Sequence, residues 1–114
     1  MRDLRYGIEI EMTGLSRGKA AETLAGFFGT RAEHTGGGYD AYAMRDAQGR
    51  VWKIVSDGSI QTQKKVRGQT VAADSTYSVE LVSPVCVYED IETIQEIVRA
   101  LRRNNALVND SCGI

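Results

Sequence analysis

The stretch from Leu4 to Met12 reads Leu-Arg-Tyr-Gly-Ile-Glu-Ile-Glu-Met and decides much of the fold. Apolar side chains from Tyr6 onward alternate with Gly7, Glu9 and Glu11. Because successive side chains of a β-strand point to opposite faces, this period of two predicts a strand with one apolar and one acidic face. Glu9 and Glu11 should leave the same face, with their Cα atoms about 6 to 7 Å apart.

The rest of the chain predicts two helices and further strands around this one. Ser16 and Gly29 bracket a run with apolar residues at helical spacing, and Asp90 precedes a second such run that ends at Asn104. Residues 39–46 and 50–56 predict a hairpin, residues 61–75 a polar connection, residues 76–83 a strand, and residues 106–109 a last short strand. Since strands and helices do not alternate regularly, we predict an α+β fold, a mostly antiparallel sheet with two helices packed on one face.

Composition narrows the class of protein. The 114 residues are 42% hydrophobic and 25% charged, which suits a single domain over residues 1–114 with one modest core. The net charge of -1 favours neither nucleic acid nor an anionic membrane as a partner. No apolar stretch approaches the roughly 20 residues of a membrane span, so we expect a cytoplasmic protein. Cys86 and Cys112 lack His or Cys neighbours at ligand spacing and are predicted to be free thiols.

Acidic side chains recur on the predicted strands. Glu80 lies between two apolar residues of the strand over 76–83, so its side chain should point away from the core. If the strands share one sheet, Glu9, Glu11, Glu80 and Asp57 converge on one surface. Like charges there repel one another unless they are protonated or share a cation. Carboxylate oxygens favour magnesium, manganese or calcium over zinc, so Glu9, Glu11 and Glu80 are candidate metal ligands.

Simpler interpretations compete with a metal site. A Glu-x-Glu strand is most often a half-buried strand with a solvated polar face. Asp57 precedes Gly58, which is also ordinary turn chemistry. Lys53 is the candidate contact for a cofactor phosphate, although a solvated lysine is the commoner case. His34, the single histidine, precedes a glycine-rich loop and is assigned no role.

Four segments in order resemble the amidoligase family over nearly the whole chain. They are Tyr-Gly-Ile-Glu-Ile-Glu-Met at 6–12, Trp-Lys-Ile-Val-Ser-Asp-Gly-Ser-Ile at 52–60, Val-Glu-Leu-Val-Ser-Pro at 79–84 and Asn-Asp-Ser-Cys-Gly-Ile at 109–114. This family is similar to glutamate-cysteine ligases and glutamine synthetases, whose active site lies on the concave face of a curved antiparallel sheet and binds magnesium-ATP.

The resemblance implies a reaction and roles for four residues. Glu9 and Glu11 match the family's E-x-E metal ligands, Glu80 matches the acid of its E-L-x-S-P strand, and Asp57 matches the acid of its D-G-S segment. The implied reaction joins a small-molecule or peptide carboxylate to an amine through an acyl phosphate, with ATP and Mg²⁺ or Mn²⁺ as cofactors. The D-G-S acid of the family binds metal or the amine substrate, and Asp57 is the candidate catalytic residue, which orients the ammonium or accepts its proton. Apart from the resemblance, Lys53 is the candidate ATP contact.

One departure from the family pattern sets further expectations. In the family the C-G-I segment continues into an H-x-H strand, whereas this sequence ends at Ile114. We therefore expect the N-terminal part of a ligase domain that is inactive alone and associates with itself through an exposed sheet edge. A binding module derived from a ligase is the alternative function. A magnesium-dependent nuclease is the weaker third one, because the chain offers little basic surface for phosphates.

Overall fold

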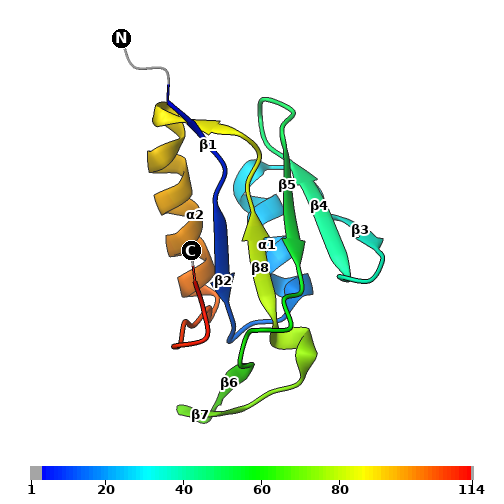
Figure 1. Ribbon diagram of the computed structural model, residues 1–114, viewed down its shortest axis with the longest axis vertical. Coiled ribbons are helices and arrows are strands. Elements are labelled where there is room, and N and C mark those ends of the chain that lie inside the picture. The colour runs from blue at the N-terminus through cyan, green and yellow to red at the C-terminus, as the bar shows by residue number, and fades with distance from the viewer. Residues whose placement is uncertain (1–3, 114) are drawn as a thin grey trace.

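A computed structural model describes residues 4–113 (Figure 1). Two α-helices are present, α1 (Arg17–Phe28) and α2 (Ile91–Arg103), with short 3-10 helices at Ser75–Tyr77 and Tyr88–Asp90. The strands are β1 (Arg5–Tyr6), β2 (Glu9–Met12), β3 (Glu33–Gly36), β4 (Ala41–Arg45), β5 (Val51–Val55), β6 (Gln63–Val66), β7 (Gln69–Ala72), β8 (Val79–Val82) and β9 (Cys86–Val87).

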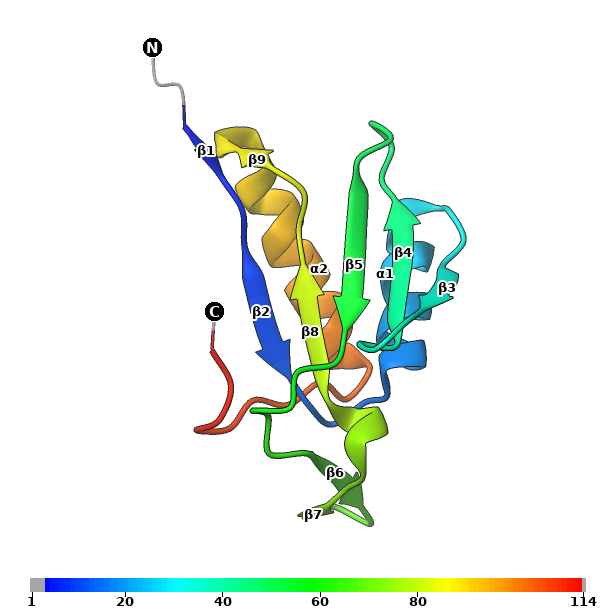
Figure 2. The ribbon, with the colours of Figure 1, turned by 45° about the vertical axis from the view of Figure 1, so that its right-hand side comes forward.

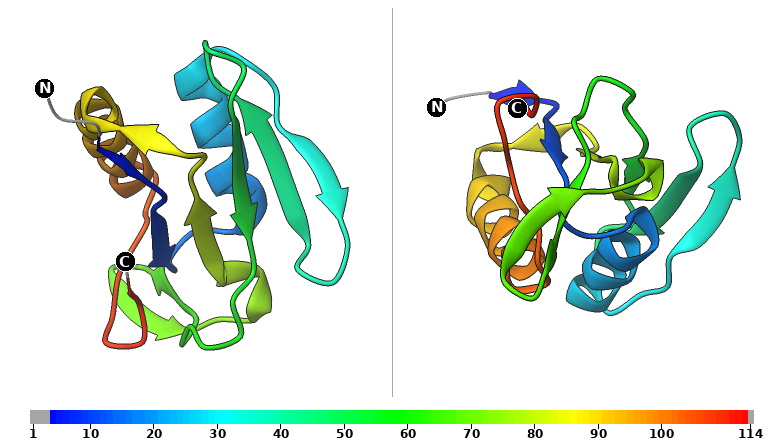
Figure 3. Two further views of the ribbon diagram at one scale, coloured as in Figure 1. Left: turned by 45° about the horizontal axis from the view of Figure 1, so that its top comes forward. Right: turned by 90° about the horizontal axis from the view of Figure 1, so that it is seen from below.

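A five-stranded antiparallel sheet forms the centre of the molecule. Its strand order is β2-β8-β5-β4-β3, so the two halves of the chain interleave, with β8 inserted between β2 and β5 (Figure 2). Both helices lie on one face of this sheet (Figure 3). The α+β prediction of an antiparallel sheet with two helices on one face is confirmed.

The hydrophobic core fills the space between the sheet and the helices. Trp52 is fully buried there, and its ring lies 5.3 Å from that of Phe28 in α1. The other buried sheet residues on this face are flanked along their strands by more exposed residues, as in a half-buried sheet. They are Ile10, Met12, Met44, Ile54, Val79 and Leu81.

Both predicted helices are present, with their expected ends. The Ser16 side chain accepts a hydrogen bond from the Lys19 N–H, and Gly29 ends α1 in the left-handed region at φ 70°. Asp90 precedes α2, but its carboxylate makes no cap bond to that helix. It instead accepts from the Val87 N–H and binds the Arg50 guanidinium through both oxygens.

Four details differ from the sequence prediction. The strand expected over 4–12 is divided into β1, which pairs with β9, and β2, which pairs with β8. The connection over 61–75 contains the hairpin β6–β7. Residues 33–36, at the start of the glycine-rich loop, form the strand β3, which is not among the predicted strands and which pairs with β4. Residues 106–109 form no strand, and only Leu107 makes a bridge, to Thr13. The polar composition of residues 61–75 concealed a turn at Arg67-Gly68, where both residues have positive φ.

Within residues 4–113, neither helix is long and apolar enough to cross a membrane. Cys86 is buried, Cys112 is half-buried, and both are free thiols, as predicted.

Candidate functional site

The face of the sheet opposite the helices carries the acidic side chains. Across β5, β8 and β2, the strand register sets Val55, Glu80 and Glu11 in one row. The next row sets Val82 between Lys53 and Glu9 in the same way. Because the register fixes which residues stand side by side, Glu11 and Glu80 are direct neighbours on this open face.

Asp57 joins these two residues from the turn that follows β5. Its Oδ1 accepts hydrogen bonds from the Ser59 N–H at 2.9 Å and from the Ser59 hydroxyl at 2.8 Å. The Ile60 N–H donates to the Asp57 carbonyl at 3.2 Å. The Asp-Gly-Ser turn therefore folds back on itself and holds the Asp57 carboxylate in a fixed orientation.

Glu11, Asp57 and Glu80 converge to form what we call the acidic triad. Each of these half-buried residues offers one carboxylate oxygen, and the three oxygens lie within 4.8 Å of one another. Three hard oxygen donors at this spacing match the ligand chemistry of Mg²⁺, Mn²⁺ or Ca²⁺. The donor set thus fits a divalent cation.

The surroundings of the acidic triad shift the pKa values of its three carboxyl groups in different directions. Hydrogen bonds from Ser59 lower the pKa of Asp57 to about 2. Burial, followed by the interaction with Asp57 and the charge of Glu9, raises the pKa of Glu80 to about 7. The contact with Asp57 also raises the pKa of Glu11. Without a cation, Asp57 is therefore ionised, and a proton on Glu80 relieves the repulsion near neutral pH.

The C-terminal segment holds Glu11 from the outer side of β2. The Gly113 N–H donates to Glu11 Oε1 at 2.8 Å, and the Glu11 N–H donates to the Gly113 carbonyl at 2.8 Å. Directly after β2, Thr13 exchanges two backbone hydrogen bonds with Leu107. The β2 edge of the sheet is therefore covered at these positions, and self-association through an exposed sheet edge stays a prediction.

Two of the sequence-predicted site residues lie outside the acidic triad. Glu9 and Lys53 lie on the same open face, but one row away from Glu11 and Glu80. Glu9 lines a cavity of about 460 Å³ with Gly7, Ile8, Val82 and Ser83. The structure thus brings together Glu11, Asp57 and Glu80 of the predicted residues, and leaves Glu9 and Lys53 beside them.

Two cavities border the acidic triad. One of about 400 Å³ is lined by Tyr39, Val55, Ser56, Asp57, Gly58 and Glu80. The other, of about 560 Å³, lies between β2, α2 and the C-terminal segment, and Glu11 lines it together with mostly apolar residues. Space for small molecules therefore exists on both sides of the carboxylates.

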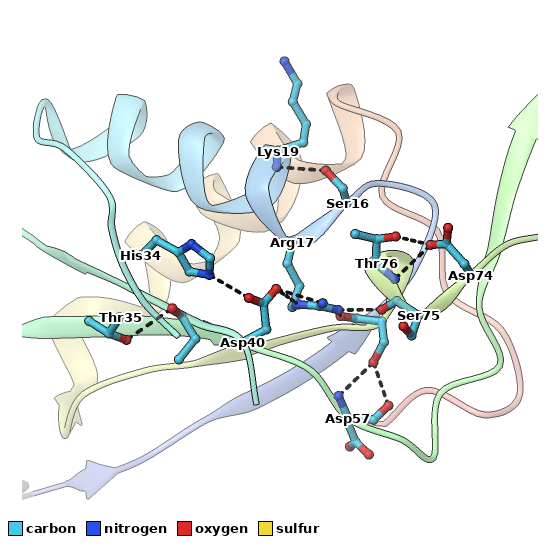
Figure 4. A network of polar contacts seen from close by, with 12 residues as sticks. Ser16, Arg17, Lys19, His34, Thr35, Asp40, Asp57, Asp74, Ser75 and Thr76 are labelled. Carbon is cyan, nitrogen blue, oxygen red and sulfur yellow. Dashed lines mark hydrogen bonds and ion pairs between the residues drawn. The ribbon is translucent and has the colours of Figure 1, made fainter. Parts of the chain in front are cut away.

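A polar network that no sequence pattern predicts lies beside the site. Arg17 is buried at the start of α1 and forms an ion pair with Asp40, whose other carboxylate oxygen contacts His34 (Figure 4). No sequence signal marks Arg17, because an arginine after a helix cap is normally solvated. His34 was assigned no role, yet its ring stacks on Tyr42 at 4.3 Å.

Comparison with known proteins places the chain in a family. No curated protein and no solved structure matches it. The family model described as "Putative amidoligase enzyme" matches residues 2–114, which is almost the entire sequence. With this match and the ordered segments that carry the acidic triad, the chain belongs to the amidoligase family.

Proposed function

We propose that the chain carries the cation site of an ATP- and magnesium-dependent ligase that forms an amide bond between a carboxylate and an amine. Family membership supports ligase chemistry. The observation that carries the proposal is the convergence of Glu11, Asp57 and Glu80 within 4.8 Å. Ligation of this kind needs divalent cations to hold ATP, and a cluster of carboxylate oxygens is what binds such cations.

The geometry supports one cation held between the three residues. Ligands on opposite sides of Mg²⁺ lie about 4 Å apart, because each metal–oxygen bond is about 2.1 Å long. The triad oxygens span up to 4.8 Å, so small side-chain rotations bring them to that spacing. Three protein ligands leave the remaining coordination positions for water and phosphate oxygens.

The reaction proceeds by two displacements. The substrate carboxylate takes the γ-phosphoryl group of ATP, which releases ADP and forms an acyl phosphate. The amine then attacks the acyl carbon, phosphate leaves with the electron pair of the broken C–O bond, and the proton that the amine nitrogen loses passes to solvent. The bound cation supplies neutralisation of the phosphate charge. Glu11, Asp57 and Glu80 would hold that cation, and Glu11 and Glu80 take no part in proton transfer.

Asp57 and Lys53 have separate proposed roles. The low pKa of Asp57 keeps its carboxylate ionised at neutral pH, so it can orient a substrate ammonium in the cavity that it shares with Tyr39. Lys53 projects from the neighbouring row of the open face, where its ammonium group can reach an ATP phosphate.

Amine-dependent release of ADP tests this function. The protein is incubated with Mg²⁺, ATP and a panel of carboxylates and amines. The Glu80→Gln variant should lose at least a hundredfold in kcat/KM, whereas Glu96→Gln, on the exposed surface of α2, should retain wild-type activity. Cation binding without turnover for any substrate pair would instead favour the non-catalytic binding module.

A further inference from the structure

The backbone of Asp57 is attached to β8 by one side chain. The Ser78 hydroxyl donates to the Asp57 carbonyl at 2.7 Å and accepts from the Asp57 N–H at 2.8 Å. Ser78 is 4% exposed, has extended backbone and directly precedes β8, two residues before Glu80. Since residues two apart share a face, this hydroxyl fixes the Asp57 backbone next to the place where Glu80 emerges.

Ser78 is in turn held by Arg17. The Arg17 Nη1 donates to the Ser78 carbonyl at 2.9 Å and to the Ser75 carbonyl at 2.5 Å. The same guanidinium binds Asp40 through Nε and Nη2 (Figure 4). The Arg17 side chain is 8% exposed, so its planar group is held by these acceptors rather than by water.

We propose that Ser78 and Arg17 are positioning residues for the acidic triad, with Ser78 fixing the backbone of Asp57 beside Glu80 and Arg17 fixing the backbone of Ser78. The inference rests on the proposed cation site. Asp57 is the triad member that lies outside the five-stranded sheet, so the sheet register alone does not set its place. The Ser78 hydroxyl, which is hydrogen-bonded to both the N–H and the carbonyl of Asp57, fixes the position of Asp57 that the sheet register leaves open.

We call this arrangement, in which one side-chain hydroxyl bonds both the N–H and the carbonyl of a distant residue, a hydroxyl clamp. The chain contains a second hydroxyl clamp that serves as a matched control. The Thr13 hydroxyl donates to the Gln63 carbonyl at 3.0 Å and accepts from the Gln63 N–H at 2.9 Å, which is the same two-bond arrangement. Thr13 is fully buried. It is the residue after Met12 in the Met12–Val79 pair, and Ser78 is the residue before Val79, so the two hydroxyls lie just beyond the same end of the β2–β8 ladder. The hydroxyl clamp of Thr13, however, holds the start of β6, which carries no acidic residue.

The test measures Mn²⁺ affinity by calorimetry for the wild type, Ser78→Ala and Thr13→Val. Loss of a residue that orients a metal ligand typically weakens affinity by 10- to 100-fold, and we expect about tenfold for Ser78→Ala. Thr13→Val should stay within about twofold of the wild type, and Ser78→Thr, which retains the hydroxyl, should recover most of the affinity. Faster amide hydrogen exchange at Asp57 in Ser78→Ala, and at Gln63 in Thr13→Val, shows that each variant has lost its hydroxyl clamp.

Each outcome decides the inference. Wild-type Mn²⁺ affinity in Ser78→Ala, or an equal loss in Thr13→Val, would overturn it while leaving the cation site standing. Absence of Mn²⁺ binding by the wild type would overturn the cation site, and the positioning role with it. If Ser78→Ala does not fold, Arg17→Lys provides the measurement, because it keeps the charge and loses the fork that reaches two carbonyls. We expect a three- to tenfold loss for Arg17→Lys, and unchanged affinity would contradict the proposal.

Discussion

Glu11 and Glu80 stand directly opposite each other on neighbouring antiparallel strands. The Glu11 N–H points away from β8, toward Gly113, so the two form a non-hydrogen-bonded pair, in which Cβ atoms approach to about 4.5–5.5 Å. Like charges at such positions destabilise a sheet. The pair therefore carries a cost in stability that a cation or a proton relieves.

The ligand set can be separated residue by residue. Glu11→Gln and Glu80→Gln should each weaken Mn²⁺ binding at least tenfold, because each removes one of three converging oxygens. Glu9→Gln should cost less than threefold, since Glu9 lies one row away and contributes only long-range charge. Calorimetric titration at one pH and ionic strength checks this. A loss for Glu9→Gln equal to that for Glu11→Gln would restore Glu9 as a direct ligand.

Stability of the cation-free protein should decrease as pH rises from about 4.5 to about 7. The pKa of Glu80 is near 4.5 when unfolded and about 7 when folded, so the folded state binds more protons in this window. By linkage, the free energy of unfolding falls with pH there, on the order of 1–2 kcal/mol after allowance for solvent screening. The opposite shift of Asp57 acts only below about pH 4 and does not cancel this.

Urea unfolding at pH 5 and pH 7.5 measures that slope. Glu80→Gln should lose most of the pH dependence and be more stable than the wild type at pH 7.5. Glu96→Gln, half-exposed in α2, should keep the wild-type slope. Adding millimolar Mn²⁺ should flatten the wild-type curve, because a cation favours the ionised carboxylates. A wild-type protein that gains stability over this range would refute the assignment.

The sequence predicts the strands that carry Glu11 and Glu80. It does not predict which three acidic residues come together. Alternation around Glu9 and Glu11 specifies an acidic face, but a strand alone does not say which of the two meets Glu80. That choice depends on register, which follows from the pairing of distant strands. Asp57 is held beside Glu80 by two hydrogen bonds from its backbone to the Ser78 side chain, and no sequence pattern marks Ser78. Long-range contacts of this kind leave no periodic signal.

The Arg50–Asp90 ion pair should contribute strongly to stability. Asp90 is 7% exposed, binds Arg50 through two bonds of 2.9 Å and also accepts from the Val87 N–H. Asp90→Ala should cost about 2–3 kcal/mol, because it leaves buried donors without their acceptor. Glu96→Ala, which removes the exposed i,i+3 pair with Arg99, should cost less than about 0.5 kcal/mol. Chemical denaturation compares them, and equal losses would contradict the prediction.

Two glycines should respond oppositely to alanine. Gly14 has φ +91°, and a Cβ there would lie 2.3 Å from the Asn105 carbonyl oxygen and 2.7 Å from Leu107 Cγ. Gly14→Ala should therefore cost about 3 kcal/mol or more. Gly26 lies inside α1 with nothing within 4 Å of the added Cβ, so Gly26→Ala should stabilise by about 0.5–1 kcal/mol. Melting temperatures that move in the same direction would show the turn at Gly14 to be adaptable.

Lys53 should affect ATP and leave the cation site unchanged. It lies on the open face, with Val82 separating it from Glu9, and it is exposed to solvent. Lys53→Met keeps the aliphatic stem but removes the ammonium group, so the Kd for Mg-ATP should rise about tenfold through loss of one charged contact to a phosphate. Lys19→Met, on α1 at the opposite side of the molecule, is the control and should bind Mg-ATP as the wild type does.

The two affinities together decide the role of Lys53. Mn²⁺ binding without nucleotide should be unchanged in Lys53→Met, because Lys53 contributes no metal-ligand oxygen and lies a row away from the acidic triad. If Mg-ATP binding is also unchanged, Lys53 is a solvated surface lysine, and the phosphate contact must come from another basic residue. If instead Mn²⁺ affinity rises, the lysine competes with the cation for the carboxylates, and its charge on the open face balances the acids rather than binding nucleotide.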